Sequence, residues 1–344
     1  MKIGIVGDIH WSRYSSILRL RGNVYSYRLE NCIESINWAE QVTAECNFVV
    51  YLGDFFDSPE LTAEEITAIK ELTWNSREHF FLVGNHEMGL NDLSYSSSHL
   101  FDYIDITSGA TVIDAPSMYE IGNCAINFIP YILEDSRKPL SEYIHKIENK
   151  HTIIFSHNDI AGLQLGQYTS KVGFEISEIE DNCDLFINGH LHNGSKVTNK
   201  ILNIGNLTGQ NFSEDAFKYD HCIFILDTDT MQVAVYENPF AINFYKIDTT
   251  KTAINLDVLK QNSVITLKVS DDADISQIKQ ILDSAQNILA YRVLVVPAEK
   301  SETEILQNTK ELLSVNHLQK FSEYILQTLG KSDIIVEELD EVLK

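Results

Sequence analysis

The sequence predicts an α/β fold in which short buried strands alternate with helices. Apolar runs recur along the chain, and continuous apolar runs are typical of strands that are buried on both faces. Helical patterns at residues 29–42 and 63–72 separate the early runs, and such alternation indicates an α/β architecture. The expected strands lie at residues 3–6, 48–52, 80–83, 126–129, 152–155 and 185–187.

The composition is that of an ordinary globular protein. The 344 residues allow one large domain or two smaller ones, and no run is long enough to span a membrane. We expect the first residues to form a strand and not a signal peptide. The five cysteines are irregularly spaced and include no CxxC pair. We therefore expect reduced thiols, a cytoplasmic location and no membrane partner.

The net charge of −24 is the unusual feature of the composition. A chain this acidic should be soluble, and nucleic acid as a whole should repel it. A role on nucleic acid would therefore need a local exception, a metal ion or a basic partner.

Polar residues follow five of the apolar runs, at the point where each strand is expected to end. Ligands in open α/β sheets collect beyond the carboxyl ends of the strands, so these side chains should meet. In extended backbone, residues i and i+2 point to one side, which predicts a common pocket for His190 and His192. The residues are Asp8, His10, Asp54, Asp57, Asn85, His86, His157, His190 and His192.

This set of side chains predicts a metal site. Imidazole and carboxylate ligands together suit manganese, iron or zinc better than magnesium or calcium. Seven ligands are too many for one tetrahedral ion, but they suit two ions that share a carboxylate. Two ions roughly 3.5–4 Å apart are the usual clamp for attack at phosphorus. The glycine before each ligand group would let the backbone turn sharply and keep bulk away from the ions.

The ordered set DxH, GDxxD, GNHE, H and GHLH resembles the calcineurin-like metallophosphoesterases over roughly residues 1–235. The resemblance implies a β-sandwich flanked by helices and two divalent ions, which would lower the pKa of a water between them. It implies that Asp54 bridges the ions and that His86 binds no metal but helps the leaving oxygen depart. One ion would be held by Asp8, His10, Asp54 and His192, and the other by Asp54, Asn85, His157 and His190.

Within that superfamily, the chain is similar to the DNA-repair nuclease branch of SbcD-type exonuclease subunits, which includes tailed-phage relatives. The similarity rests on the GDxxD form, on the short spacing to GNH and on the stretch ILNIGNLTGQNFSED. After residue 240, two strand-like stretches flank a helical one. The resemblance implies a nuclease domain at residues 1–240, a small α/β capping domain that positions DNA at 241–300, and a helical partner-binding segment at 301–344.

The same resemblance implies a manganese-dependent exonuclease on duplex ends and endonuclease on single strands. It would act in recombination and double-strand-break repair with an SbcC-type coiled-coil ATPase, and we expect a homodimer. The candidate contact for the ATPase is an apolar stripe at helical spacing, although internal packing is the alternative. The stripe consists of Leu318, Phe321, Ile325 and Leu329.

An arginine-rich stretch follows His10 and is the candidate DNA contact. Four of the seven arginines lie between Trp11 and Leu29, where no acid occurs. Interleaved aromatic residues could stack on unpaired bases while Arg13, Arg19 and Arg21 grip phosphates. The alternative is a solvated face, or pairing with acids elsewhere.

Two other functions remain open at this stage. The chain could be a phosphodiesterase or phosphatase of the same superfamily that acts on a small molecule or a protein. It could also be a non-catalytic scaffold, although the complete ligand set argues against that. Asp57 would either orient a metal ligand or serve as a turn residue before Pro59.

Overall fold

The computed structural model describes residues 1–14, 20–89, 98–104, 109–165, 168–250 and 255–297. Its first sheet has six strands in the order β14-β13-β1-β2-β3-β4. They are β1 (Lys2–Val6), β2 (Phe48–Tyr51), β3 (Glu78–Leu82), β4 (Ala110–Ile113), β13 (Cys222–Asp227) and β14 (Gln232–Glu237).

The second sheet also has six strands, in the order β11-β12-β10-β7-β6-β5. They are β5 (Ser117–Ile121), β6 (Cys124–Ile129), β7 (His151–Ser156), β10 (Leu185–Asn188), β11 (Ser195–Lys196) and β12 (Ile201–Asn203). A hairpin, β8 (Gln164–Leu165) and β9 (Tyr168–Thr169), forms a separate small sheet.

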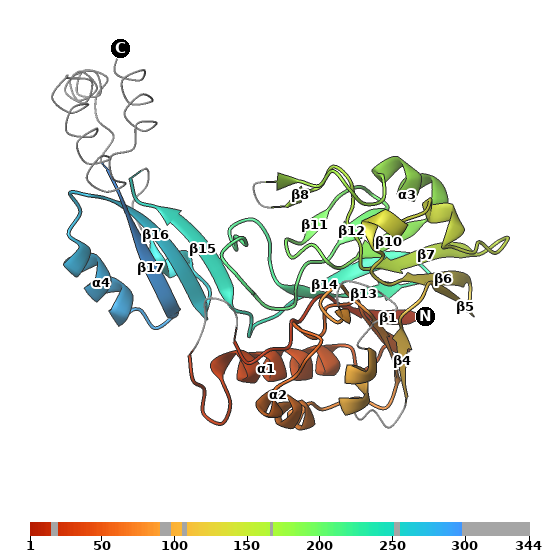
Figure 1. The fold of residues 1–344 in the computed structure, drawn as a ribbon, viewed down its shortest axis with the longest axis horizontal. Coiled ribbons are helices and arrows are strands. Elements are labelled where there is room, and N and C mark those ends of the chain that lie inside the picture. The colour runs from red at the N-terminus through yellow and green to blue at the C-terminus, as the bar shows by residue number, and fades with distance from the viewer. Residues whose placement is uncertain (15–19, 90–97, 105–108, 166–167, 251–254, 298–344) are drawn as a thin grey trace, which may run out of the picture.

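Helices flank the two sheets (Figure 1). They are α1 (Tyr27–Val42), α2 (Ala63–Ala68) and α3 (Ile176–Asn182). Short 3-10 turns are η1 (Ile69–Glu71), η4 (Ser98–Tyr103), η5 (Glu134–Ser136), η6 (Leu140–Glu142) and η7 (Leu256–Val258). The predicted α/β fold is confirmed, and each predicted strand is found within two residues of its expected ends. The helix expected at 63–72 is shorter, because α2 passes into η1 at Ile69.

Alternating side chains of each central strand build two layers of core. In β2, Val50 points between the sheets and packs with Phe128 and Phe155 of the second sheet. Its neighbour Tyr51 points to the other face and packs with Ile36 of α1. Both faces of the strand are therefore buried, which explains why β2 reads as a continuous apolar run and not as an alternating one.

Parallel pairing brings the functional strand ends to one rim. β1, β2 and β3 run parallel to one another, as do β6, β7, β10 and β12. Outer strands such as β13 and β5 are antiparallel to their neighbours. The loops that leave β1, β2 and β3 therefore emerge at one edge of the first sheet, and those that leave β7 and β10 emerge at one edge of the second. These two edges together are called the rim.

Helix α1 is tied to this rim by Arg28, the last arginine of the stretch between Trp11 and Leu29. The Arg28 side chain is buried and donates to the carbonyl oxygens of Ile9, at 2.6 Å, and Gly209, at 2.9 Å. Trp11 is also buried and cannot stack on a base. An arginine inside a run of polar and aromatic residues has the pattern of a solvated residue, but here it satisfies carbonyls of the loops around the rim.

A three-stranded parallel sheet lies beside the sandwich, at the left of Figure 1. It comprises β15 (Asn243–Asp248), β16 (Ser263–Ser270) and β17 (Ile288–Val296). α4 (Ile275–Ser284) connects β16 to β17, with Leu282 packed in the core of this sheet. The sequence predicted β16, α4 and β17 but not β15. The stripe from Leu318 to Leu329 lies outside the described residues.

Within the described ranges, no helix is long and apolar enough to cross a membrane.

The packing between the two sheets can be tested with Phe128→Ala. The Phe128 ring is fully buried and stacks on Phe80 and Phe155, with centroids 5.0 and 5.5 Å away. Losing the ring should lower the free energy of unfolding by about 3–5 kcal/mol, as measured by urea denaturation. Val235→Ala, at a position that is 56% exposed, should change it by less than about 0.5 kcal/mol. Equal losses in the two variants would contradict this account of the core.

Candidate metal centre

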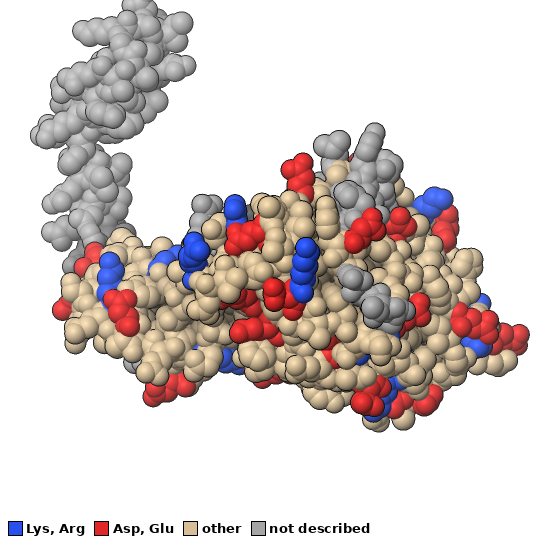
Figure 2. Space-filling model, turned by 90° about the horizontal axis from the view of Figure 1, so that it is seen from below, with Lys and Arg blue, Asp and Glu red and all other residues tan. Residues whose placement is uncertain are grey.

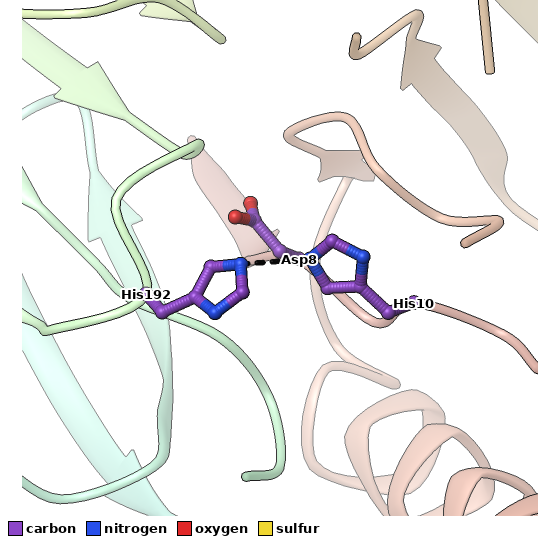
Figure 3. A group of neighbouring side chains, drawn as sticks. All are labelled: Asp8, His10 and His192. Atoms are coloured by element: carbon purple, nitrogen blue, oxygen red, sulfur yellow. Dashed lines mark hydrogen bonds between the residues drawn. The ribbon is translucent and has the colours of Figure 1, made fainter. Parts of the chain in front are cut away.

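One group of potential ligands joins the two sheets at the rim. Asp8 follows β1, His10 lies two residues further on, and His192 follows β10 of the other sheet. The Nε2 atoms of His10 and His192 face each other 2.9 Å apart, with Asp8 beside them (Figure 3). Two imidazole nitrogens and a carboxylate thus converge on one point.

A second group lies next to the first and is formed by Asp54, His157 and His190. The Asp54 Oδ2 atom is 3.1 Å from His157 Nε2. The Asn85 Oδ1 atom lies 3.3 Å from His157 Nε2 and 3.0 Å from His190 Nδ1, which places the amide in the same group. Asp54 Oδ2 is also 4.0 Å from His10 Nε2, so this carboxylate lies between the two groups.

The backbone at three of these residues is left-handed, which corrects the predicted geometry. The φ angles are 52° at His10, 47° at Asp54 and 70° at His190, a region that side-chain-bearing residues rarely adopt. The rule for extended backbone therefore does not apply, and His190 and His192 do not share one group of ligands. His190 turns towards Asp54, whereas His192 turns towards His10.

Glycines let the loops approach these ligands closely. A Cβ atom at Gly84 would lie 2.2 Å from the Asp54 carboxylate, and one at Gly53 would lie 2.4 Å from the His157 ring. Gly53 also has a φ of 102°, which favours glycine. These distances match one predicted reason for the glycines, which is space around the ligands. The other predicted reason, a sharp turn of the backbone, is supported by a positive φ at Gly53 but not at Gly84.

Each ligand histidine is held by a partner on its other ring nitrogen. Asp57 Oδ1 lies 3.0 Å from His10 Nδ1, and Glu214 Oε1 lies 3.3 Å from His192 Nδ1. Asp159 Oδ1 lies 3.4 Å from His190 Nε2, and the carbonyl oxygen of Leu52 accepts from His157 Nδ1 at 2.7 Å. Outer partners of this kind orient metal-binding imidazoles and fix their tautomers.

The donor set fits a pair of divalent ions. The Asp8 Oδ2 atom is buried and has no hydrogen-bond partner among the described residues, which is costly unless a cation satisfies it. Burial raises the pKa of Asp54, but the His157 imidazole outweighs it and holds that pKa well below the ordinary value. Burial lowers the pKa of His10. Burial also acts to lower the pKa of His157, but the Asp54 charge outweighs burial and raises that pKa to about 10. An ion bound to His157 would therefore take the place of a proton.

Glu87 fastens two ligand loops together. Its carboxylate accepts hydrogen bonds from the backbone N–H groups of Phe56 and Gly84, both at 2.7 Å. Burial raises the pKa of Glu87 to about 8, and the Asp54 charge adds to the rise. The loop after β2, which carries Asp54, is thereby held against the loop after β3, which carries Asn85.

His86 stands at the mouth of the centre. Its backbone N–H donates to Asp54 Oδ1 at 2.9 Å, and its ring lies 4.6 Å from that of His10. The side chain is 39% exposed, so it can reach a molecule that enters from solvent. Its ring also groups with His10 and Asp54 as a potential ligand.

The predicted DNA contacts are only partly in place. Arg13 is half-exposed, lies 3.9 Å from Glu64 and covers the Tyr14 ring. Arg21 is exposed and lines a surface pocket together with Glu64 of α2, and Arg19 lies outside the described residues. The arginine-rich stretch has no acid of its own, but the fold supplies one from α2. Arg13 is therefore partly paired, as the alternative interpretation expected.

Sequence reasoning missed the partners of the ligand histidines at Asp159 and Glu214. Glu214 lies in the stretch ILNIGNLTGQNFSED, and the sequence assigns no role to the acidic end of that stretch. Asp159 follows His157 by two residues, and no pattern distinguishes it from a surface acid.

The strand ends of the sandwich thus gather two adjoining groups of imidazole and carboxylate ligands, an arrangement suited to a pair of metal ions. Residues 1–194, more than half of the chain, match the family model described as calcineurin-like phosphoesterase. The chain therefore belongs to the calcineurin-like phosphoesterase family.

Individual relatives are distant. Over 159 residues, 43% of this chain, it is 25% identical to "Putative phosphoesterase 078R" of Invertebrate iridescent virus 3, and the match spans only 43% of that relative. A dimetal phosphatase from Danio rerio is 12% identical, with 69% of this chain and 99% of that one covered and a TM-score of 0.40. The protein TT1561 of Thermus thermophilus is 9% identical, with coverages of 69% and 98% and a TM-score of 0.38.

The two groups of ligands should bind two divalent ions separately. We expect His192→Ala and His157→Ala each to lose one manganese ion per chain, and Asp54→Ala to lose both, since Asp54 serves both groups. The measurement is the bound manganese, by elemental analysis after desalting. His145→Ala, at an exposed histidine outside both groups, should keep both ions. Full occupancy in Asp54→Ala would contradict the shared carboxylate.

Proposed function

We propose that the chain is a manganese-dependent phosphodiesterase that cleaves DNA, as an exonuclease on duplex ends and an endonuclease on single strands. The observation that carries the proposal is the position of Asp54 between the two groups of ligands. Two ions bridged there would stabilise the charge that develops on a phosphodiester under attack by water.

His86 is the proposed acid for the leaving oxygen. Its Nδ1 atom lies 2.9 Å from the carbonyl oxygen of Asp57. A carbonyl oxygen only accepts, so Nδ1 carries a hydrogen, and Nε2 is the nitrogen that can face the substrate. The Asp57 carboxylate, 3.6 Å from the same ring, would stabilise the protonated imidazole.

The position of the three-stranded sheet is an argument for a long substrate and against a small one. The backbone N–H of Gly209 donates to the Ile242 carbonyl, and the N–H of Ala216 donates to that of Phe244. These contacts attach the sheet to the loop that carries Glu214, beside the metal centre. We propose residues 241–300 as a capping domain that positions DNA, next to a nuclease domain at 1–240.

The remaining assignments are proposals of the same kind. An SbcC-type coiled-coil ATPase would bind the segment at 301–344, two copies of the chain would form a homodimer, and the protein would act in the cytoplasm in double-strand-break repair.

A phosphatase or phosphodiesterase for a small molecule or a protein is the second candidate, and the surface charge favours it. On the face shown in Figure 2, acidic and basic side chains are interspersed, and the described residues form no continuous basic surface there. Arg28 and Trp11, which lie in the same stretch as the expected contacts Arg13, Arg19 and Arg21, are buried. DNA affinity draws heavily on lysine and arginine, so binding would rest on few residues.

The role of His86 is tested with His86→Ala on linear duplex DNA and on bis-p-nitrophenyl phosphate, both with manganese. Loss of the proton donor should lower kcat on DNA by about 10²- to 10⁴-fold while two manganese ions stay bound. Cleavage of the small diester should fall much less, because p-nitrophenolate leaves without a proton. His151→Ala, at a surface histidine 45% exposed, should keep full activity. If wild type cleaves only the small diester, the second candidate is correct. If His86→Ala cleaves DNA as fast as wild type, His86 is not the acid.

The arginine contacts are tested with the double variant Arg13→Gln and Arg21→Gln. If both side chains neutralise phosphates, affinity for single-stranded DNA should fall, and the slope of log affinity against log salt should become shallower by about 1.4. The measurement is fluorescence anisotropy over a series of salt concentrations. Lys150→Gln, next to the end of β7 that lies away from His157, serves as the charge control. An unchanged slope in the double variant would remove these residues from the interface.

A further inference from the structure

Glu214 is a buried carboxylate for which neither the family resemblance nor the ligand set gives a role. Its side chain is inaccessible to solvent. It lies in the β12–β13 loop, residues 204–221, and not after a strand that carries a ligand. A buried charge needs close partners, so its contacts indicate what it does.

Those contacts aim Glu214 at one ligand. Its Oε1 atom lies 3.3 Å from His192 Nδ1. The same oxygen is held in place, because it also accepts hydrogen bonds from the backbone N–H of Gln210 at 3.0 Å and from the Asn206 amide at 3.0 Å. His192 therefore cannot rotate without breaking its contact with a fixed carboxylate.

The opposite nitrogen of the same ring belongs to the metal centre. His192 Nε2 lies 2.9 Å from His10 Nε2 and groups with Asp8 (Figure 3). Because Nδ1 and Nε2 lie on opposite sides of the imidazole, the position of Glu214 decides where Nε2 points.

The loop is anchored at its other side to the three-stranded sheet. Ala216 N–H donates to the Phe244 carbonyl at 2.8 Å. The Phe212 ring packs edge-on against Phe244, with centroids 5.2 Å apart, and lies under the Arg292 guanidinium at 3.8 Å. Glu214 is thus two residues from one anchor and two from the other.

We propose that Glu214 is a positioning residue for His192, and that the β12–β13 loop couples the three-stranded sheet to the ion held by Asp8, His10 and His192. The inference rests on the proposed two-metal site and not on the identity of the substrate. The loop contacts the sheet on both sides of Glu214, at Phe212 and at Ala216. A shift of the sheet would therefore move the carboxylate, and with it the imidazole.

The test is a manganese titration of the full chain by isothermal titration calorimetry, with Glu214→Gln as the variant. Glutamine keeps an oxygen that can accept hydrogen bonds from the loop, but it removes the negative charge that faces His192. We expect one of the two manganese Kd values to rise about 10- to 100-fold, with the other unchanged. Glu40→Gln is the matched control, because Glu40 is also buried and lies 3.2 Å from a histidine, His79, away from the centre. It should lower Tm and leave both Kd values unchanged.

The coupling is tested with Phe212→Ala, which touches no ligand. We expect a smaller weakening, several-fold, of the same single ion, whereas Tyr236→Ala, an exposed aromatic outside the loop, should have no effect. Two unchanged Kd values in Glu214→Gln, or an equal rise in both, would overturn the positioning role. An unchanged Kd in Phe212→Ala would overturn the coupling. A wild-type chain that binds fewer than two ions would instead overturn the proposed site, which separates the two failures.

Discussion

The centre depends on holding one buried carboxylate, Asp54, between two groups of ligands. A charge removed from water must be paired or hydrogen-bonded, and Asp54 has both an imidazole and a backbone N–H beside its carboxylate. Its side chain faces His157 and accepts from the backbone N–H of His86, and its own carbonyl oxygen accepts from the N–H of His10 at 2.9 Å. Three loops are therefore fixed relative to one residue. The strained φ of 47° at Asp54 persists because these contacts outweigh a cost of order 1–3 kcal/mol.

The sequence was sufficient where burial governs the pattern. β1, β2, β3, β7 and β10 are buried on both faces, so their apolar runs predicted them, and a polar residue at the end of such a run has few places to go except the rim. It was insufficient where the backbone leaves the extended region. Nothing in the residue types distinguishes a left-handed His10 or His190 from an extended one, since the loop contacts that hold them come from distant segments.

Contacts between residues that are far apart in the chain could not be predicted from the sequence either. Glu214 meets His192 across 22 residues, and Arg28 meets Gly209 across 181. β15 was missed because its sequence, NFYKID at Asn243–Asp248, is neither a continuous apolar run nor a strict alternation of polar and apolar residues. A charged or polar residue is assigned to the surface by default, and only the tertiary contacts show which ones are buried for a reason.

The acid surplus does not by itself decide against a polyanionic substrate. At physiological salt the Debye length is about 8 Å, so carboxylates on the far side of the molecule contribute little at the rim. The local balance matters more. Apart from Glu87, whose pKa is raised to about 8 by burial and the Asp54 charge, five carboxylates line or adjoin the centre, those of Asp8, Asp54, Asp57, Asp159 and Glu214. Two divalent ions would bring four positive charges against them, and without those ions the same carboxylates would repel any phosphate. Binding of phosphate and binding of metal are therefore linked, because the positive charge of the ions would be shared between the carboxylates and the phosphate. The residues that position the ligand histidines act on substrate affinity through the same linkage, although none of them needs to touch the substrate.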